Sequence, residues 1–599
     1  MVADCRTPKL AESRSRTALC LLLASMVLWS GWFIWRTSFV AGGQRVFCLF
    51  DDAMISMAYA RNLVEGHGLN WARAGEPVEG FSHPLWTFLM VPVNAVPLDL
   101  RYRSLLVQLL SLGFLVVHIV LVRSLTLRYF STERARHWLP AALLTAFYYP
   151  LSSWALLGME SGLQALLTTA SVLFAFDIVC GGEDRHRELL LVGALAYLLR
   201  MDMLLMVIVV QIYVFAHGGV RNRRQLVHWC QGAAVFAGLA AGYSVFRWFY
   251  FHDVLPNTYY LKLYRIPLTL RLARGARTLG QTFSEHSLLL TVAVAGAAAL
   301  HRLRPDRGDL HGRLALLLSL FLVACAYSVY VGGDVWEMSQ LVRANRFVVY
   351  VMPCVFIVLN ALINEAASRI ESTNVRRRFT AVATAVALLS ADGLWLAEAP
   401  AENLKDLTVG RRPALVAAQE RNYGGLRTLQ GVLGPQGVVA ASNAGLPAYF
   451  SDYRMVDVFG YNDRHIARLP PALPLGPNGY LRFLPGHMKW DFDFIFAQYH
   501  PDAIMAHCFP AWRLLRSGYR PHDGGFWLME EKGRRPPLIR GGSPLTRAAP
   551  RRHLNPALFP LDQAGAEDRV EPRSARAPRS VGSRGVAFAA RRRWRAGVH

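Results

Sequence analysis

The sequence predicts a polytopic α-helical membrane protein with a small α/β domain toward its C-terminal end. Of its 599 residues, 53% are hydrophobic and only 18% are charged, whereas a soluble globular domain carries about 25% charged residues. The apolar residues gather in long runs without charge, and only residues 403–530 return to the mixed composition of a globular domain. Together these observations exclude an ordinary soluble enzyme.

Eleven apolar runs are candidates for membrane spans. They occupy residues 17–35, 104–122, 137–159, 161–176, 189–199, 203–220, 226–246, 287–300, 314–333, 347–364 and 380–391. Several are shorter than the roughly 20 residues that a bilayer requires, so we expect flanking residues to complete them. The first run is rich in Trp and ends at Trp35 and Arg36 rather than at a small-residue cleavage site, which favours an uncleaved helix over a signal peptide.

The basic residues indicate how these spans are oriented. Four of them precede the first span, and the clusters of arginine that follow fall in alternate loops. Because short cytoplasmic loops carry an excess of Lys and Arg, this pattern predicts a multi-pass cell-membrane protein whose N-terminus, residues 1–16, is cytoplasmic. Residues 84–98 would invert every later loop if they crossed the membrane, so we predict that they form an interfacial or re-entrant segment on the outer side.

An odd number of spans places the C-terminal part of the chain outside the cell. We therefore expect a transmembrane domain at 17–398 with a catalytic outer loop at 43–98, an extracytoplasmic α/β domain at 399–531 and a disordered basic tail at 532–599. Strand-like runs in the α/β domain are VVAAS (438–442), RMVDVFG (454–460) and DAIMAH (502–507).

The tail explains half of the net charge of +24. It holds 16 Lys and Arg against 4 Asp and Glu, in a composition rich in Arg, Pro, Ala and Gly. Such a segment cannot bury a core. We interpret it as a solvated extension, or one read in the wrong frame, and expect no nucleic-acid partner.

The outer loop near residues 250–285 breaks the charge rule. It carries five basic residues, of which Arg271, Arg274 and Arg277 would share one face of a helix. Two interpretations stay open, namely an amphipathic helix that faces solvent or lipid headgroups and a site for an anionic substrate.

The eight cysteines show no CxxC and no regular spacing. They therefore predict neither a zinc site nor a disulfide framework. Cys48 and Cys508 both fall in segments predicted to lie outside, which leaves one disulfide between them open.

Unusual polar clusters fall on the outer side of the predicted topology. Asp51 and Asp52 stand together just beyond the first span, where two carboxylates are costly unless they bind a cation or act as an acid or base. The alternative is that one of them caps the helix that begins at Ala53.

Further charges flank other outer boundaries beside Gly or Pro residues that let the backbone turn. With the two aspartates they predict an enclosed polar site rimmed by Asp51, Asp52, Glu160, Arg200, Asp202, Lys262, Asp334, Arg343 and Arg346.

This mixture of carboxylates and cations at a lipid interface suits the transfer of a sugar from a lipid phosphate. A carboxylate can deprotonate the acceptor hydroxyl, and Arg or Lys can take up the charge of the departing phosphate. Arg343 and Arg346 are the better phosphate clamp, because a guanidinium binds two oxygens at once. The alternative is that Arg200 with Asp202, or Asp334 with Arg343, form ion pairs that are only structural.

The motifs in these loops resemble those of the integral-membrane glycosyltransferases of the GT-C class. The segments are FDDAMIS (50–56), EPVEGFSHPLW (76–86), GMESGL (158–163), LPNTYYLK (255–262), GGD (332–334) with a later RF (346–347), and DVFGYNDRHIAR (457–468). The branch most similar to them contains the terminal β-1,2-arabinofuranosyltransferases of mycobacterial cell walls. The resemblance covers residues 45–530, with its motifs in the same order.

This resemblance implies an inverting transferase that uses a polyprenyl-monophosphate sugar. It implies that the first outer loop supplies the catalytic carboxylate at the positions of Asp51 and Asp52. The sequence does not order the two, and we favour Asp52 as the general base and Asp51 as the residue that positions the acceptor or binds a divalent cation. Glu79 and Asn257 lie in two of the matching motifs and are expected to bind substrate. The outer domain would help to bind the glycan acceptor, with Asp457, Asp463 and His465 lining the site.

The predicted function is therefore transfer of one sugar, with arabinofuranose favoured, from a polyprenyl-phosphate donor to a cell-envelope glycan or glycoprotein. A hexosyl transferase such as a mannosyltransferase is the first alternative. A transporter or flippase of lipid-linked sugars is the second, although the sequence shows no internal repeat of the kind common in transporters. A non-catalytic envelope-assembly protein is the third. No GxGxxG or Walker-type motif is present, so no nucleotide cofactor is expected.

Overall fold

The computed structural model describes residues 6–73, 75–130, 137–303, 308–336, 345–394, 400–410, 412–473, 479–506 and 508–530. Contacts divide the chain into two compact units, Met1–Leu545 and Thr546–His599. All of the described residues belong to the first unit. The predicted basic tail at 532–599 lies outside the described residues.

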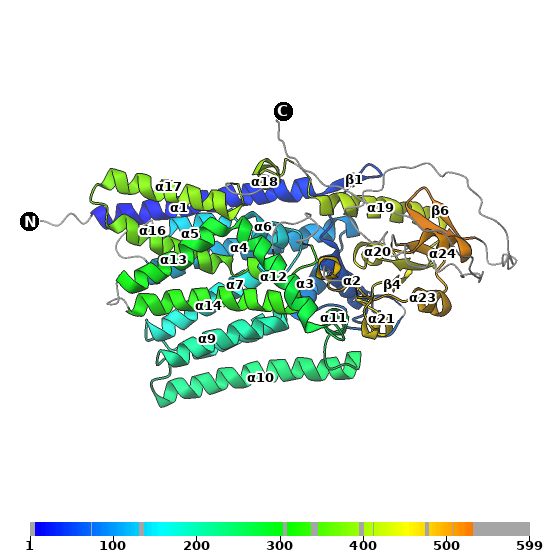
Figure 1. Cartoon of the computed structure of the whole chain (residues 1–599), viewed down its shortest axis with the longest axis horizontal. Helices are drawn as coiled ribbons and strands as arrows, with labels where there is room; N and C mark the ends of the chain where they lie inside the picture. Colours follow the sequence, from blue (N-terminus) through cyan, green and yellow to red (C-terminus); the bar gives the residue numbers. More distant parts are fainter. Residues whose placement is uncertain are drawn as a thin grey trace, which may run out of the picture. The chain divides into compact units, whose positions relative to one another are not determined.

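The N-terminal two thirds of the first unit are mainly helical (Figure 1). A short hairpin of β1 (Phe39–Ala41) and β2 (Gln44–Val46) separates the first two helices. The helices are α1 (Arg6–Thr37), α2 (Asp51–Val64), α3 (Pro84–Ala95), α4 (Leu100–Tyr129), α5 (Leu139–Ala146), α6 (Tyr149–Leu156), α7 (Ser161–Val179), α8 (His186–Leu199), the 3-10 helix η1 (Met201–Met203), α9 (Leu204–Ala216), α10 (Arg223–Phe251), α11 (Asn257–Lys262), α12 (Leu268–Glu285), α13 (Ser287–Leu303), α14 (Gly308–Val331), α15 (Arg346–Val349), α16 (Met352–Ser368) and α17 (Thr373–Ala391).

Each of the eleven predicted apolar runs coincides with helix. Ten of them fall on α1, α4, α7, α8, α9, α10, α13, α14, α16 and α17. The run at 137–159 is interrupted between α5 and α6, where Tyr148 has extended backbone. Pro150, in the first turn of α6, has no N–H to donate back to a continuous helix. The segment predicted to be interfacial or re-entrant, 84–98, forms the short helix α3, whose Pro84 occupies the first turn.

Within the described residues, five helices are long and apolar enough to cross a membrane, namely α1, α4, α7, α10 and α14. The number becomes six if α12 and α13, which meet at 88°, count as one bent span. A mostly helical chain with several apolar helices is therefore confirmed, whereas the number of eleven spans stays a prediction.

The basic loops meet at the end of the helices that lies away from the β-sheet (Figure 1). There Arg128 pairs with Asp177 at 2.8 Å, and Arg313 donates to the carbonyl oxygen of Tyr129. Arg221 likewise donates to the carbonyl of Val179. The charges predicted to be cytoplasmic thus share one end, and the predicted outer loops share the other.

The C-terminal part of the first unit is a mixed α/β domain. Its sheet has the order β4-β3-β5-β7-β6, in which β3 is parallel to β4 and β5 while β7 is antiparallel to β5 and β6. The elements are α18 (Pro400–Leu407), α19 (Ala414–Val432), β3 (Val438–Ala441), α20 (Leu446–Phe450), β4 (Arg454–Asp457), α21 (Arg464–Arg468), α22 (Gly479–Arg482), α23 (Phe492–Tyr499), β5 (Ala503–Met505), α24 (Ala511–Arg516), β6 (Tyr519–His522) and β7 (Phe526–Met529). The three strands expected from the sequence are present as β3, β4 and β5.

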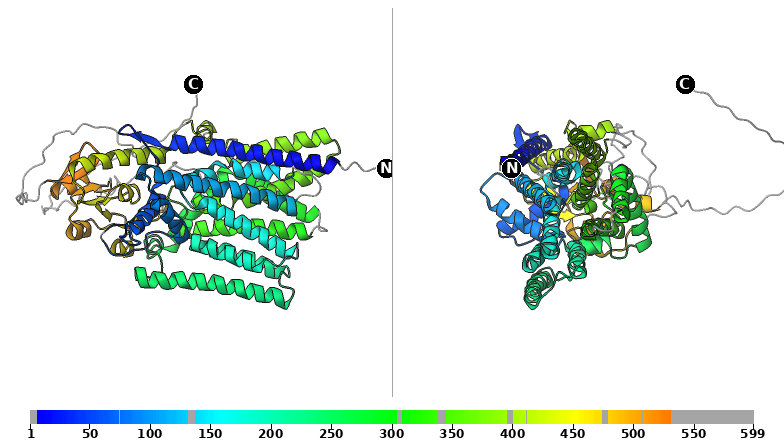
Figure 2. Two further views of the ribbon diagram at one scale, coloured as in Figure 1. Left: turned by 180° about the vertical axis from the view of Figure 1, so that it is seen from behind. Right: turned by 90° about the vertical axis from the view of Figure 1, so that its left-hand side faces the viewer.

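This sheet domain packs directly against the loops that join the helices (Figure 2). The guanidinium of Arg61 in α2 donates to the carbonyl oxygens of Tyr449 and Ser451, and the indole of Trp71 donates to that of Ala444. The predicted boundary at 398 and 399 therefore does not separate two compact units.

Helix α12 corrects the interpretation of two of the three arginines in the basic loop, whereas Arg277 is exposed, as the amphipathic-helix interpretation expects. The side chains of Arg271 and Arg274 are buried rather than exposed to lipid or aligned in a substrate site. They donate to the carbonyl oxygens of Tyr330, Gly332 and Asp334 at the C-terminal end of α14. A helix leaves its last four carbonyls without partners, and cations are favourable there.

The cysteines in the described residues are all free thiols, Cys48 and Cys508 included. The disulfide that the sequence left open is therefore not formed in this structure. Cys48 is instead buried in the hydrophobic core.

Candidate active site

A cavity of about 190 Å³ lies where the helices meet the sheet domain. The ends of several helices that are distant in sequence meet at this cavity. Asp52 lies in the first turn of α2, Glu160 precedes α7, Arg200 ends α8, Lys262 ends α11 and Arg346 begins α15. The cavity is thus built from the outer loops in which the sequence predicted an active site.

Six predicted residues line this cavity together. They are Asp52, Glu160, Arg200, Asp202, Lys262 and Arg346. Apolar side chains such as Ile55, Met159 and Leu255 complete the wall. Charged groups thus face a space with partly apolar walls, where their interactions are stronger than in water.

Asp52 and Asp334 share one guanidinium. The Nη1 atom of Arg346 lies 2.9 Å from Oδ2 of Asp52, and its Nε lies 3.1 Å from Oδ2 of Asp334. The Asp334 side chain is only 1% exposed and does not line the cavity, whereas that of Asp52 is 26% exposed and does. The buried Asp334 therefore holds the guanidinium of Arg346 on the side away from the cavity, whereas the carboxylate of Asp52 faces the cavity.

Arg200 is held by two carboxylates on a neighbouring part of the wall. Its Nη1 lies 2.8 Å from Glu160 Oε1, and its Nε and Nη2 lie 2.9 and 3.2 Å from the two oxygens of Asp202. Burial raises the pKa of Glu160, but the nearby His83 and Arg200 outweigh it and lower that pKa to about 2. Glu160 is therefore ionised at neutral pH.

Lys262 differs from the two arginines. Among the described residues it has no carboxylate in direct ion-pair contact, and its Nζ lies 5.3 Å from the ring centre of Tyr461. Burial, with a contribution from the positive charge of Arg346, lowers the pKa of Lys262 to about 8. It is therefore mostly protonated at pH 7, and within the part of the chain that the structure describes it has no carboxylate paired with it as the arginines have.

Asp51 occupies a different environment from Asp52. Its two carboxylate oxygens accept hydrogen bonds from the backbone N–H groups of Gly445 and Leu446 at 3.1 and 3.0 Å. Burial raises the pKa of Asp51 to about 6, against these two hydrogen bonds. Asp51 does not line the cavity, and it fastens α2 to the start of α20.

Glu79 and Asn257 hold the wall of the cavity rather than facing it. Glu79 is buried and accepts hydrogen bonds from Arg247 and Tyr243 of α10. The side-chain amide of Asn257 donates to the carbonyl oxygens of Gly460 and Tyr461 at 2.9 Å. Both residues thus position backbone that surrounds the cavity.

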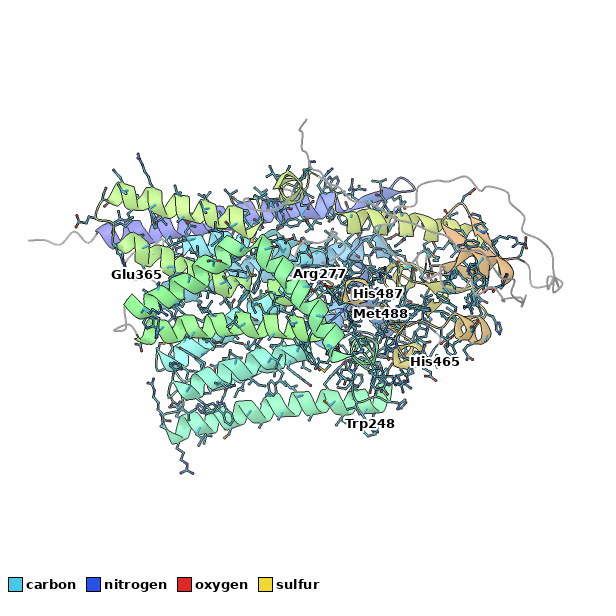
Figure 3. The ribbon with its side chains drawn as sticks, viewed as in Figure 1. Trp248, Arg277, Glu365, His465, His487 and Met488 are labelled. Atoms are coloured by element: carbon cyan, nitrogen blue, oxygen red, sulfur yellow. The ribbon has the colours of Figure 1, made fainter. Side chains whose placement is uncertain are left out.

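Three predicted residues of the sheet domain line a second cavity, of about 370 Å³. Asp457 accepts hydrogen bonds from backbone N–H groups of its own loop, and Asp463 caps α21 and accepts from Tyr499. His465 lies nearer to the sheet than His487 does (Figure 3), and its Nε2 atom lies 3.3 Å from Oδ2 of Asp491. Arg343 lies outside the described residues.

Sequence reasoning missed several groups at the first cavity. His83 lines it, with its Nε2 2.7 Å from the hydroxyl of Ser56 and its Nδ1 4.0 Å from Glu160. Tyr461 lines it from the sheet domain. Both stand inside motifs already recognised, so a closer inspection of those motifs could have found them.

No motif in the sequence pointed to His487, which also lies near the cavity wall. It belongs to an irregular loop and lies at the junction of the helices and the sheet domain, with Met488 beside it (Figure 3). Its ring lies 5.1 Å from that of Phe459 and 5.8 Å from that of Tyr461. Burial lowers the pKa of His487 to about 4, so the ring is neutral at pH 7.

The described residues contain no group of three or more His, Cys, Asp or Glu that could hold a metal ion. The predicted divalent cation at Asp51 would therefore need ligands from the substrate, from water or from elsewhere in the chain. Both oxygens of Asp51 are already turned toward the N–H groups at the start of α20.

Comparison with known proteins gives a domain family and distant likenesses in structure. Residues 414–536 match a family described as a domain of unknown function (DUF8728), which spans most of the sheet domain. No curated protein sequence matches the chain.

Solved structures of other proteins resemble this chain at low identity. A crystal structure of ArnT from Cupriavidus metallidurans bound to undecaprenyl phosphate is 12% identical, with a TM-score of 0.47 over 73% of this chain and 85% of that one. The oligosaccharyltransferase of Archaeoglobus fulgidus in its apo form is 11% identical, with a TM-score of 0.47 over 82% of this chain and 69% of that one. At these scores and identities the likeness establishes no activity for this chain.

Proposed function

We propose that the chain is a membrane glycosyltransferase that moves one sugar from a polyprenyl-monophosphate donor to a hydroxyl of a cell-envelope glycan or glycoprotein. The observation that carries this proposal is the pairing, in one cavity, of a carboxylate open to the cavity with a lysine that has no described carboxylate partner. Asp52 is the general base, and Lys262 binds the phosphate.

The reaction needs one proton transfer and one bond exchange. Asp52 takes the proton of the acceptor hydroxyl, whose oxygen attacks the anomeric carbon of the donor sugar. The bond from that carbon to the phosphate oxygen breaks, and its electron pair leaves with the polyprenyl phosphate. A single displacement from the opposite face inverts the anomeric configuration.

Lys262 suits a monophosphate donor. Among the described residues, Arg346 and Arg200 are each paired with two carboxylates, whereas Lys262 has no direct carboxylate partner. A sugar phosphodiester carries one negative charge and gains a second as it leaves. Lys262 then stabilises the charge that develops.

Arabinofuranose is the favoured sugar, on the resemblance of the sequence motifs, and a hexose such as mannose is the alternative. The predicted topology places the reaction on the outer face of the cell membrane. The shared end of the basic loops, opposite the sheet domain, supports that orientation.

The test is turnover by the full-length chain in lipid nanodiscs. Synthetic polyprenyl-phosphate arabinofuranose and polyprenyl-phosphate mannose are offered with envelope glycans, and released polyprenyl phosphate and new glycan are measured by mass spectrometry. Asp52→Asn is expected to lower the rate by about 100-fold or more, as loss of a general base does. Asp309→Asn, an exposed carboxylate at the start of α14, is the matched control. Sustained turnover by Asp52→Asn would refute the assigned base.

A further inference from the structure

Glu160 has one carboxylate oxygen that nothing in the described residues satisfies. Its side chain is only 1% exposed, and its Oε1 atom accepts the hydrogen bond from Arg200. The other oxygen, Oε2, is buried and has no hydrogen-bond partner among the described residues. A buried charged oxygen without a partner is costly, because it has lost its water and made no bond in exchange. A ligand that donates a hydrogen bond to this atom would remove the cost.

His83 stands opposite that oxygen on the wall of the first cavity. Its Nδ1 atom lies 4.0 Å from Oε2 of Glu160, which is beyond hydrogen-bond distance, and both residues line the cavity. A third oxygen atom at normal hydrogen-bond distance from each of them would bridge the two. The gap between the two side chains therefore matches one bridging oxygen atom.

The hydrogen bonds on the other side of the imidazole decide which nitrogen carries its proton. The Nε2 atom of His83 lies 2.7 Å from the hydroxyl of Ser56, which lies 3.2 Å from that of Thr87. A proton on Nε2 would leave the lone pair of Nδ1 facing the carboxylate of Glu160, which is unfavourable. With the proton on Nδ1, Ser56 donates to Nε2 and the N–H group faces the negative charge. Burial lowers the pKa of His83, so the ring is neutral and has this one N–H to donate.

A hydroxyl is the group that fits between these two atoms. It can donate one hydrogen bond to Oε2 of Glu160 and accept another from Nδ1 of His83. An ionised phosphate oxygen or a carbonyl oxygen has no proton to donate, and it would face the charge of Glu160. An ammonium group has no lone pair with which to accept from His83. The pair of Glu160 and His83 therefore distinguishes O–H from other polar groups.

The size of the first cavity indicates which molecule supplies this hydroxyl. Its volume is about 190 Å³, and a cavity of about 150 Å³ takes one benzene ring, so one sugar ring fills it. In a single displacement the base and the departing phosphate lie on opposite faces of the anomeric carbon, so the ring between Asp52 and Lys262 belongs to the donor. Asp52 is close enough to His83 to influence the pKa of its ring. The same donor ring can therefore reach both side chains.

We infer that His83 and Glu160 together bind one hydroxyl of the donor sugar and thereby select the sugar that is transferred. This assignment rests on the proposed function and gives it a specificity-determining residue, His83. Arg200 holds Glu160 and Ser56 holds His83, so the two atoms keep their positions before the donor arrives. A donor that lacks the hydroxyl leaves both groups unpaired in a partly apolar cavity, which penalises it strongly.

Equilibrium binding of donor analogues tests the pair without turnover. The full-length Asp52→Asn chain in nanodiscs is titrated calorimetrically with polyprenyl-phosphate arabinofuranose, with polyprenyl-phosphate mannose, and with analogues of each that lack one sugar hydroxyl. Removal of the hydroxyl bound by the pair is expected to weaken binding about 50-fold, since one of its two hydrogen bonds is to a charged group. When His83→Phe is added, which keeps a ring but removes Nδ1, the same removal is expected to weaken binding only about ten-fold.

Two further variants in the same chain separate recognition from structure. His83→Asn can place an amide N–H the same number of bonds from the backbone as Nδ1, so it is expected to keep most of the 50-fold difference although it loses the contact with Ser56. Thr87→Val is the matched control, because it removes the buried hydroxyl next to Ser56 without changing a group at the cavity. It is expected to keep the whole difference.

The outcomes are separable from those of the proposed function. A hydroxyl whose removal costs less in His83→Phe, but not in Thr87→Val, supports the assignment even if Asp52 proves not to be the base. If the intact donor binds and no hydroxyl behaves in this way, the assignment is overturned while the proposed function stands. Equal differences in His83→Phe and His83→Asn would also overturn it, because the N–H would then play no part. Failure of both intact donors to bind would overturn the assignment and the proposed function together.

Discussion

Two adjacent aspartates divide their tasks according to where each side chain points. Successive residues of a helix point about 100° apart, so Asp51 meets the N–H groups at the start of α20 while Asp52 faces the cavity. The sequence identified both as exceptional but could not distinguish them, because their difference depends on a segment almost 400 positions away. Arg200 and Lys262 were recognisable for a simpler reason, since charges at the edge of apolar runs are costly.

Asp51→Asn is expected to lower stability by about 1–3 kcal/mol, because an amide accepts poorly where two N–H groups converge. The effect depends on pH. Since the pKa of Asp51 is raised to about 6 in the folded chain, wild type gains stability as the pH falls through 6, whereas the amide does not titrate. Melting temperatures of both proteins at pH 7 and pH 5 should therefore differ more at pH 5. A gap that narrows at pH 5 would contradict this assignment.

Lys262 should limit donor binding at high pH. Its pKa of about 8 predicts that kcat/KM for the donor is full at pH 7 and falls as the pH rises through 8, because the neutral amine no longer attracts the phosphate. The pH at which kcat falls should be higher than the pH at which kcat/KM falls, because a bound phosphate favours the protonated form of Lys262. In Lys262→Arg, whose side chain stays charged, kcat/KM should no longer fall as the pH rises through 8. Steady-state kinetics of the wild-type chain and of Lys262→Arg between pH 6.5 and 9.5 would check both expectations. If kcat/KM of Lys262→Arg fell at the same pH as that of the wild type, Lys262 would be excluded as the titrating group.

At the scale of elements, close helix crossings decide which segments can pack. Gly275 of α12 lies against the backbone of α14, and a Cβ atom there would stand 2.4 Å from the carbonyl oxygen of Val329. This crossing brings Arg274 to the carbonyls at the end of α14 and so helps to shape the loop that holds Asp334. The sequence placed Arg271, Arg274 and Arg277 on one face of a helix, but only the first two are buried against α14, and Arg277 is exposed. The partner of the buried arginines could not be inferred from spacing.

Gly275→Ala is expected to destabilise the chain by about 1–3 kcal/mol, because backbone atoms of two helices must separate to admit the methyl group. Gly280→Ala offers a control in the same helix, since a Cβ atom there meets nothing within 4 Å. It should be neutral or stabilising, as alanine is the better helix former. Thermal unfolding in detergent measures both, and equal melting temperatures for the two variants would contradict the close crossing.

The apolar runs predicted helices well, because long uncharged stretches have one stable form in a membrane. The strands β3, β4 and β5 were also identified, being short, apolar and bounded by turns. The hairpin of β6 and β7 was missed, since Arg520 and His522 interrupt its apolar pattern. His487 escaped notice because a loop has no periodicity that marks a residue as buried.

At the scale of the whole molecule, charge separates the two ends of the helices. The arginine-rich loops gather at one end, and the sheet domain with both cavities occupies the other. Arginines are retained on the cytoplasmic side of a membrane during insertion. We therefore expect the sheet domain to face the outside of the cell.

Labelling with a membrane-impermeant maleimide would check this orientation. In a chain whose native cysteines are replaced by serine, Arg427→Cys on α19 should react in intact cells. Arg377→Cys at the start of α17 should react only after the membrane is permeabilised. Both positions are exposed, so access to reagent depends on sidedness rather than burial. The reverse pattern would invert the predicted topology.

The fastening of Asp51 to α20 has a mechanical consequence. Because the neighbouring residue is the proposed base, a small tilt of the sheet domain would be transmitted to Asp52 through a single peptide unit. An antibody fragment that binds the far surface of the sheet and shifts it could thus abolish the proposed sugar transfer without entering either cavity. An inhibitor of the proposed transfer need not resemble a sugar or a lipid, because a molecule that binds the sheet domain and shifts it would displace Asp52.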